Sequence, residues 1–377
     1  MLKIRTGAPH KGDPHEARLH FVWPRRSRDW ILVYRWGKSR ISVELKGPKA
    51  NCHGSVMIQG SLERDMDLVL EEWLQATKAS AGTPEDRLTA KANVLGHGAI
   101  LAKGYMPPKV RQAIATVIPP KTRLLVLEKG IPERQRMPIE LMGTDESLWA
   151  TTFALARPEA PVSGTEMSQN QLPPGNWSHV VGDRTFRDGR EREFLRNMPE
   201  RVQNTVGKSR SLGLCRIVKP RKGFWTAVDV QESAKSSVIL TVHAHTKSAS
   251  TDQGRPCLVL SSGYAGQLEP LLLRGRSSSL KLAALNVCSS GQPEWFGGLD
   301  QGFVACLLEG GCSTVVATLA KVESRQASDG LEDLLGIWGD GKLDISQAAL
   351  RARQRAWEAG SLSPLLCAVF GDGRLIA

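Results

Sequence analysis

The sequence lacks the features of several specialised protein classes. No apolar run approaches the length that crosses a bilayer, and residues 1–20 lack the apolar core of a secretory signal. There is also no internal repeat and no glycine-rich phosphate loop. With 377 residues, 41% hydrophobic and 23% charged, the composition is that of a globular protein of one to three domains. We therefore expect a cytoplasmic protein without a membrane segment and without a cofactor.

The cysteines argue against both disulfides and a metal site. Their number is odd, no two form a C-x-x-C pair, and most lie in apolar runs, where a free thiol behaves as a small hydrophobic group. His243 and His245 form an H-x-H pair that could suit zinc together with a cysteine, but no H-E-x-x-H motif or acidic pair lies nearby. We expect free thiols and no metal. The seven cysteines are Cys52, Cys215, Cys257, Cys288, Cys306, Cys312 and Cys367.

Positive charge is concentrated near the N-terminus. The net charge is +12, and residues 1–50 hold twelve Lys or Arg against four Asp or Glu. Such an excess attracts nucleic acid or an acidic partner. These cations are interspersed with core-type residues, as over residues 30–35, and do not form a basic tail. We therefore favour a solvated basic surface, and we expect residues 1–50 to be the site if nucleic acid does bind.

The first part of the chain predicts a small antiparallel sheet followed by amphipathic helices. Turn-forming residues separate the strand-like runs, and Gly and Pro bound the helices. We place a domain boundary after residue 85, which gives an N-terminal sheet-and-helix region, 1–85, and a second domain, 86–377. The predicted strands are residues 19–23, 30–34 and 41–45, and the predicted helices begin at Ser61 or cover residues 85–103 and 109–117.

From residue 124 onward, strands alternate with helices. Continuous apolar strands in such an order predict an α/β protein with a mainly parallel sheet, covered on both faces. Residues 148–155 predict a hairpin-like return, and the Pro-, Gly- and Ser-rich residues 158–176 predict a long mobile or processed loop. The predicted strands are residues 124–127, 179–181, 214–218, 238–242, 258–260, 282–287, 314–319 and 365–370, and the predicted helices are residues 191–206, 298–309, 330–338 and 346–358.

Cys288 is the candidate nucleophile. The apolar strand over residues 282–287 leads directly to it, and a turn of small residues, Ser289-Ser290-Gly291, follows. α/β proteins bind ligands at the carboxyl ends of their strands, where a reactive side chain is exposed. The other cysteines lie within or beside apolar elements or, for Cys52, in a loop without such a strand. A thiol attacks as the thiolate, so a base should lie nearby.

Two histidines are candidates for that base. His243 and His245 follow the apolar run over residues 238–242, and His245 lies 43 residues before Cys288. In a continuing strand both would point to one face, so either could act. For each, a structural histidine satisfied at a sheet edge is the alternative. A cysteine with a histidine on a separate upstream strand at about this spacing is the layout of caspase-type proteases.

The C-terminal three-quarters of the chain resembles the CHAT family, the caspase-like peptidase domain often found in bacteria together with helical repeats. T-V-H-A-H-T at residues 241–246 is similar to the family's H-F-A-G-H-G motif, and L-N-V-C-S-S-G at residues 285–291 is similar to its L-S-A-C-E-T-G. Residues 124–142 and 298–319 are similar to further family segments in the same order. The resemblance implies a caspase-like α/β fold, with His245 as the catalytic histidine and Cys288 as the catalytic cysteine.

The resemblance also implies a mechanism of acyl transfer, in which the backbone N–H groups of Thr246 and Cys288 hold the oxyanion. The sequence departs from the family at four positions. Thr246 replaces a glycine, Ser289 replaces a glutamate, and Ala320 and Ser324 replace a tryptophan and an aspartate.

Two functions are therefore open. One is a cytoplasmic cysteine endopeptidase, a hydrolase that cleaves a protein partner in regulated proteolysis, in bacterial antiviral defence or cell death. The other is a catalytically degenerate caspase-like scaffold that binds a protein partner.

Three residues are candidates for substrate binding. Caspase-like enzymes commonly use the residue two before the cysteine in the pocket for the substrate's P1 side chain, and here it is Asn286. Because Asn286 is neutral, it favours neither a basic nor an acidic P1 residue. Asp252 and Asp300 lie in nearby loops and could supply an acidic floor. We expect control to come from a protein activator, from residues 1–85 or from the loop at 158–176.

Overall fold

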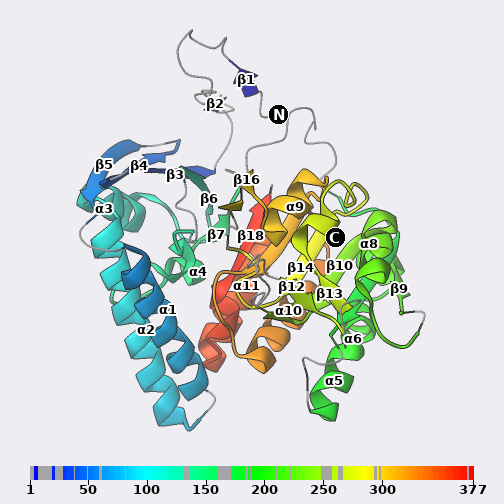
Figure 1. Cartoon of the computed structure of the whole chain (residues 1–377). Helices are drawn as coiled ribbons and strands as arrows, with labels where there is room; N and C mark the ends of the chain where they lie inside the picture. The colour runs from blue at the N-terminus through cyan, green and yellow to red at the C-terminus, as the bar shows by residue number, and fades with distance from the viewer. Residues whose placement is uncertain are drawn as a thin grey trace.

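The structure, a computed structural model, contains two sheets that lie side by side and several smaller pieces of sheet (Figure 1). In Figure 1 the N-terminal sheet and its helices form one side of the molecule, and β18 lies between them and the rest. The structure describes residues 4–6, 19–21, 29–37, 39–48, 50–58, 62–80, 82–130, 136–158, 171–182, 186, 188–208, 210–220, 222–247, 257–261, 266–292, 295–296, 299–371 and 373–377.

The central sheet has six strands in the order β18-β17-β14-β10-β8-β9. All neighbours are parallel except β18, which pairs antiparallel with β17. This confirms the mainly parallel sheet that the alternation of apolar strands and helices predicts. The strands are β8 (Asn176–Val181), β9 (Arg216–Val218), β10 (Ser237–His243), β14 (Leu282–Asn286), β17 (Thr314–Thr318) and β18 (Cys367–Gly371).

Helices cover both faces of the central sheet, because successive residues of each strand enter two different cores. In β14, Leu282 and Ala284 pack in the core beneath α10 (Ser324–Gly339), whereas Ala283 and Leu285 pack in the core on the opposite face. The first face also carries α5 (Gly189–Arg196), α6 (Met198–Val206), α7 (Ser211–Leu214) and α11 (Ile345–Ala359), and the opposite face carries α8 (Ala227–Ser236) and α9 (Phe303–Glu309).

The N-terminal sheet has five strands in the order β5-β4-β3-β6-β7. β3 pairs antiparallel with β4 but parallel with β6, so this one sheet joins strands from both sides of residue 85. β2 (Leu19–Phe21), expected here, pairs instead with β1 (Ile4–Thr6). The strands are β3 (Trp30–Trp36), β4 (Arg40–Lys46), β5 (Asn51–Met57), β6 (Arg123–Lys129) and β7 (Ala154–Ala156).

Three helices cover the N-terminal sheet: α1 (Leu62–Ala79), α2 (Pro84–Tyr105) and α3 (Pro108–Val117). A capping box begins α2, in which Thr83 and Asp86 satisfy each other's backbone N–H groups. The hairpin-like return expected over residues 148–155 is wrong. The short helix α4 (Trp149–Thr152) precedes β7, which runs parallel to β6, because the buried Trp149 packs into the core of this half.

One residue joins the two sheets. Arg157, which follows β7, donates its N–H to Val369 O at 2.7 Å and accepts from Gly371 N–H at 2.9 Å on β18. The pairing therefore runs almost without interruption from one sheet into the other. A small antiparallel sheet of β11 (His245–Lys247), β12 (Cys257–Val259) and β13 (Gln267–Leu268) begins just beyond β10.

Two further observations bear on expectations from the sequence. The loop expected over residues 158–176 lies largely outside the described residues, and at its end Leu172 N–H donates to Ile376 O at 2.7 Å. The described part of the chain contains no helix that is both long and apolar enough to span a membrane.

Candidate active site

Cys288 lies in a tight turn at the carboxyl end of β14. Ser289, the next residue, has a φ of 57°, a left-handed conformation that residues other than glycine rarely adopt. The turn is held to the end of β17, because Ser289 N–H donates to Ala320 O at 3.0 Å and Gly291 N–H donates to Thr318 O at 2.8 Å. Strained residues of this kind occur at functional sites when the surrounding contacts enforce them.

Residues from two other segments approach Cys288. The Thr246 hydroxyl, on β11, donates to the Cys288 carbonyl oxygen at 3.4 Å. The half-buried thiol of Cys288 is 3.9 Å from Val322 O, in the segment between β17 and α10. The fold therefore brings the residue directly after His245 beside the candidate nucleophile, although 42 residues separate them in sequence.

The two candidate histidines have opposite environments. His243 is the last residue of β10 and is fully buried, with Nδ1 3.0 Å from the Asn286 amide nitrogen of the neighbouring strand. Because the amide donates, Nδ1 accepts, and the neutral ring carries its proton on Nε2. That buried Nε2 has no hydrogen-bond partner among the described residues. Burial first, and then His179, hold the pKa of His243 well below its usual value, so it is a poor proton acceptor.

The chain turns away at Ala244, so His243 and His245 do not share a face of one continuing strand. His245 begins β11 and is exposed, and its ring stacks on Phe186 with 6.3 Å between ring centroids. Of the two histidines, His245 is the one exposed to solvent.

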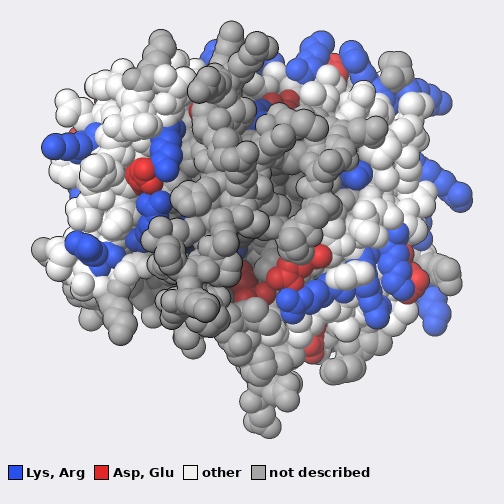
Figure 2. Space-filling model, turned by 90° about the horizontal axis from the view of Figure 1, so that it is seen from above, with Lys and Arg blue, Asp and Glu red and all other residues white. Residues whose placement is uncertain are grey.

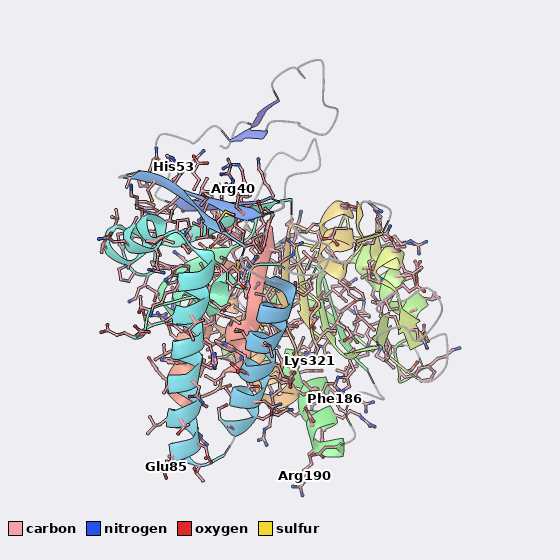
Figure 3. All side chains as sticks on the ribbon, turned by 60° about the vertical axis from the view of Figure 1, so that its left-hand side comes forward. Arg40, His53, Glu85, Phe186, Arg190 and Lys321 are labelled. Atoms are coloured by element: carbon pink, nitrogen blue, oxygen red, sulfur yellow. The ribbon has the colours of Figure 1, made fainter. Side chains whose placement is uncertain are left out.

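The candidate site lies beside the core of the N-terminal half, because Ala320 and Val322, which contact the Cys288 turn, also pack against that core. Phe186 marks the position of His245, and Lys321 directly precedes Val322, which contacts Cys288. Figure 3 shows Phe186 and Lys321 close together in the view, below Arg40 and His53 of the N-terminal sheet.

Two sets of hydrogen bonds between neutral groups lie around His243, and the rings of His179 and His243, 5.2 Å apart, bring them into contact. We call them together the histidine network: Trp177, His179, Thr241, His243 and Asn286. Trp177 Nε1 donates to Thr241 Oγ1 at 3.0 Å, and Thr241 is 2.6 Å from His179 Nδ1. His179 Nε2 donates to Leu195 O at 2.7 Å, which leaves Nδ1 as the acceptor. Burial lowers the pKa of His179 to about 4. Sequence reasoning missed this histidine, although it lies in a predicted strand.

The structure places two of the three substrate-binding candidates. The Asn286 amide nitrogen donates to Ser328 Oγ at 2.9 Å as well as to His243, so it is bound on the α10 side of the sheet. Asp300 accepts from Gly302 N–H at 2.9 Å and lies 3.3 Å from Arg136 Nη2. Asp252 lies outside the described residues. The substrate-binding roles of all three stay predictions.

Arg136 contacts the loop that follows Cys288, and sequence reasoning did not single it out. Its Nε donates to Gly291 O at 3.0 Å, and its backbone N–H donates to Gln292 Oε1 at 2.8 Å. The available signal was its place directly before the M-P-I-E-L segment at residues 137–141, which was already part of the resemblance.

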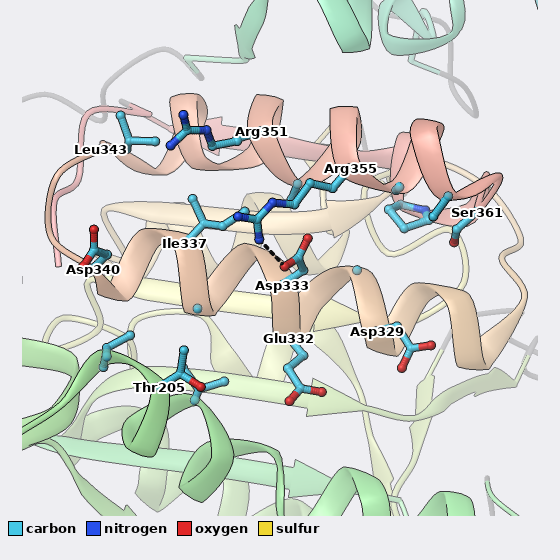
Figure 4. A pocket seen from close by; sticks show the side chains of 18 of the residues that line it. Thr205, Asp329, Glu332, Asp333, Ile337, Asp340, Leu343, Arg351, Arg355 and Ser361 are labelled. Atoms are coloured by element: carbon cyan, nitrogen blue, oxygen red, sulfur yellow. Dashed lines mark hydrogen bonds and ion pairs between the residues drawn. The ribbon is translucent and has the colours of Figure 1, made fainter.

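The described cavity lies away from Cys288. It has a volume of about 890 Å³ and runs along α10 between α6 and α11, where Arg355 pairs with Asp333 across it at 2.9 Å (Figure 4). None of the candidate site residues lines it. No group of three or more His, Cys, Asp or Glu side chains in the described ranges is placed to hold a metal ion.

The basic side chains do not gather into one patch on the face seen in Figure 2. The described Lys and Arg residues lie around its periphery, with Asp and Glu among them.

This architecture is the caspase-like α/β fold, with a mainly parallel central sheet, helices on both faces and a small antiparallel sheet. Two structures of the Saccharomyces cerevisiae separase–securin complex match it with TM-scores of 0.51 and 0.52, at 10% and 12% identity over 92% and 91% of this chain. A structure of the Porphyromonas gingivalis RgpB pro- and mature domains gives a TM-score of 0.42 at 11% identity, covering 84% of this chain and 78% of that one.

The likeness is one of fold. This chain spans about 30% of the length of the separase chain. No family model matches the sequence, and no curated protein matches it either.

Proposed function

We propose that the protein is a cysteine endopeptidase that uses Cys288 as nucleophile and His245 as base. The observation that carries the proposal is the 3.4 Å contact between Thr246 Oγ1 and Cys288 O, which joins the two segments of the CHAT-like motifs at one end of the sheet. The caspase-like fold, which the structures of the separase–securin complex share, supports it. The exposure of His245 supports it further, because the base must reach both thiol and substrate.

The mechanism assigns a separate step to each group. His245 takes the proton from Cys288, and the thiolate attacks the scissile carbonyl carbon. The backbone N–H groups of Cys288 and Thr246 stabilise the oxyanion of the tetrahedral intermediate. His245 then protonates the leaving amine, and water hydrolyses the thioester to release the acid and restore the thiol.

The substrate proposed is a protein, cleaved in regulated proteolysis of the kind the CHAT resemblance implies, in bacterial defence or cell death. The separase structures of this fold contain securin as a protein partner. By analogy, a protein partner would bind this chain, and the N-terminal sheet with α1 to α3 is the surface proposed to receive it or the substrate.

One contact favours a second candidate function, a caspase-like scaffold that binds a protein partner without cutting it. The thiol of Cys288 lies 3.9 Å from Val322 O, and a thiol that donates there must leave this position before it can attack. Thr246, where the CHAT family has glycine, adds to this possibility because its side chain restricts the backbone beside the oxyanion position.

Covalent labelling separates the two candidates. Peptide acyloxymethyl ketones with Arg, Lys, Asp, Leu or Ala at P1 would be incubated with the folded protein and the adducts weighed by intact-mass spectrometry. We expect an adduct on the wild type that Cys288→Ala and His245→Ala abolish, and that the matched thiol control Cys52→Ser retains. Labelling that survives in Cys288→Ala would contradict the proposal. No labelling with any probe, even with candidate partner proteins added, would favour the scaffold.

A further inference from the structure

Arg136 is a buried arginine whose guanidinium faces the loop after Cys288. Its side chain is 3% exposed. Besides the bond from Nε to Gly291 O at 3.0 Å, its Nη2 lies 3.3 Å from Asp300 Oδ2, and the guanidinium lies 5.2 Å from the centre of the Phe370 ring. A guanidinium presents its donors in a fixed plane, so these contacts fix the position of Gly291 relative to β18 and Asp300.

The same loop receives a second bond from the Arg136 backbone. Arg136 N–H donates to Gln292 Oε1 at 2.8 Å, and the Gln292 amide nitrogen donates onward to Leu319 O. Gln292 N–H also donates to Ser289 O at 3.1 Å, which closes the turn around the left-handed Ser289. The turn that carries Cys288 is therefore held from two sides, by β17 and by Arg136.

The segment that carries Arg136 is itself held by the N-terminal sheet. Met137 N–H donates to Glu128 Oε1 at 2.7 Å, and Arg157 Nη2 donates to Met137 O at 2.6 Å. Arg157 also pairs with Glu128 at 2.6 Å and with Glu140 at 2.5 Å, with all three side chains at most 3% exposed. We call Arg136, Arg157, Glu128, Glu140 and Asp300 the arginine cluster.

We infer that Arg136 is a positioning residue, which holds the loop after Cys288 in register with the N-terminal sheet and thereby sets the geometry of the nucleophile. The inference rests on the proposed function for its catalytic consequence. It deepens that function by giving a physical connection between the half of the molecule proposed to receive a partner and the turn that bears the thiol. A shift of Met137 relative to β6 would be passed through Arg136 to Gly291.

Two substitutions test this role. Arg136→Met keeps the volume and the contact with Phe370 but removes every side-chain donor, and Arg136→Lys keeps a charge near Asp300 but loses the planar fork. The matched control is Arg201→Met, because Arg201 on α6 makes a two-pronged pair with Glu332, at 2.8 Å for each bond, that does not involve the Cys288 loop. Thermal unfolding would first establish that each variant is folded.

Two readouts are then compared. Hydrogen exchange of backbone N–H groups at residues 289–292 reports the position of the loop without any catalysis. The rate of ketone labelling at Cys288 is separated into the maximal rate and the half-saturating concentration. In Arg136→Met we expect faster hydrogen exchange, confined to this loop. We also expect the maximal labelling rate to fall roughly ten- to a hundredfold, because a small misplacement of the reacting group lowers a rate by this much. We expect an unchanged half-saturating concentration, partial recovery in Arg136→Lys and no effect in Arg201→Met.

The outcomes are distinguishable from failure of the proposed function. If the wild type itself does not label, the proposed function fails and loop exchange alone decides the role of Arg136. Wild-type exchange and wild-type labelling in a folded Arg136→Met would overturn the inference. If Arg136→Met does not fold, Arg136→Lys decides: faster exchange at residues 289–292 supports the role, and unchanged exchange overturns it.

Discussion

Two buried polar regions meet at the Cys288 turn, and they differ in chemistry. The histidine network lies on the α10 side of the central sheet, consists of neutral groups and ends at Asn286, just before Cys288. The arginine cluster lies where the two sheets join, consists of charged groups and ends at Gly291, just after Cys288. The candidate nucleophile is thus held by neutral hydrogen bonds on one side and by ion pairs on the other.

Because of this difference in chemistry, the two regions are sensitive to different perturbations. Neutral buried imidazoles cannot take up a proton without losing their hydrogen bonds, so the histidine network is sensitive to acid. Buried ion pairs are strongly destabilised when one partner is removed, because the other charge is left without compensation. Each region can therefore be disturbed while the other is left intact.

The largest effect is expected at the centre of the arginine cluster. Arg157→Met leaves Glu128 and Glu140 buried together without their cation, and this should lower the free energy of unfolding by about 3–5 kcal/mol. Arg201→Met, which breaks a partly exposed pair with Glu332, should cost at most ~1 kcal/mol. Urea unfolding of both variants measures the difference. Equal losses would show that burial does not distinguish the two pairs.

The next effect is the acid response of the histidine network. Burial lowers the pKa of His179 from 6.5 to about 4, so the unfolded chain binds a proton that the folded chain refuses. Stability is complete above pH 6.5 and falls as the pH drops toward 4, by ~3 kcal/mol from this residue. His179→Gln should flatten the dependence of unfolding free energy on pH. Parallel curves for variant and wild type between pH 6.5 and 4 would contradict this.

A smaller effect is expected where the histidine network reaches the turn. Asn286→Ala removes the donors to His243 Nδ1 and Ser328 Oγ, and a buried acceptor left unpaired costs about 1–3 kcal/mol. Asn176→Ala, which removes an exposed bond of 3.4 Å to Ser236 O, should change stability very little. The urea unfolding midpoints of the two variants give the comparison. A loss of stability no larger in Asn286→Ala than in Asn176→Ala would show that the hydrogen bonds of Asn286 do not stabilise the histidine network.

The smallest effect distinguishes the two serines of the turn. Ser289→Gly relieves the left-handed conformation and should raise the unfolding free energy by about 1 kcal/mol or less. Ser290→Gly should lower it, because the Ser290 hydroxyl accepts from Thr318 N–H at 3.2 Å and lies 3.4 Å from Leu285 O. Thermal unfolding compares them, and a lower melting temperature in Ser289→Gly would show that the turn is not strained at Ser289.

The central sheet was predictable from sequence because its strands are continuous apolar runs. The N-terminal sheet was less so. The pairing of β3 with β6 joins residues such as Ile31 and Leu125, which no local pattern connects. β5 was missed because its polar sequence contains Gly54. That glycine is needed since a Cβ there would lie 2.6 Å from the Pro107 side chain. The helix expected over residues 191–206 is divided at Asn197 into α5 and α6.

The candidate site was also predictable only in part. Cys288 follows from its place after an apolar strand, and its neighbour Thr246 follows from the order of the motifs. The buried partners Arg136 and His179 do not follow, because their roles arise from contacts with residues 155 and 62 positions away. The small sheet that begins at His245 also separates the two histidines, which the strand pattern alone left equivalent.

The central claim is that Cys288 is a thiol activated by His245, and its rate of alkylation tests this directly. The seven thiols of the wild type and of His245→Ala would be alkylated with iodoacetamide at pH 7 and followed by peptide mass spectrometry. Burial raises the pKa of Cys306 and Cys312 to about 12 and that of Cys367 to about 11, and it also raises the pKa of Cys52, so these thiols serve as internal references. We predict that Cys288 reacts fastest in the wild type and slows to the rate of Cys52 in His245→Ala. A Cys288 that reacts no faster than Cys52, or equally fast without His245, would contradict the account.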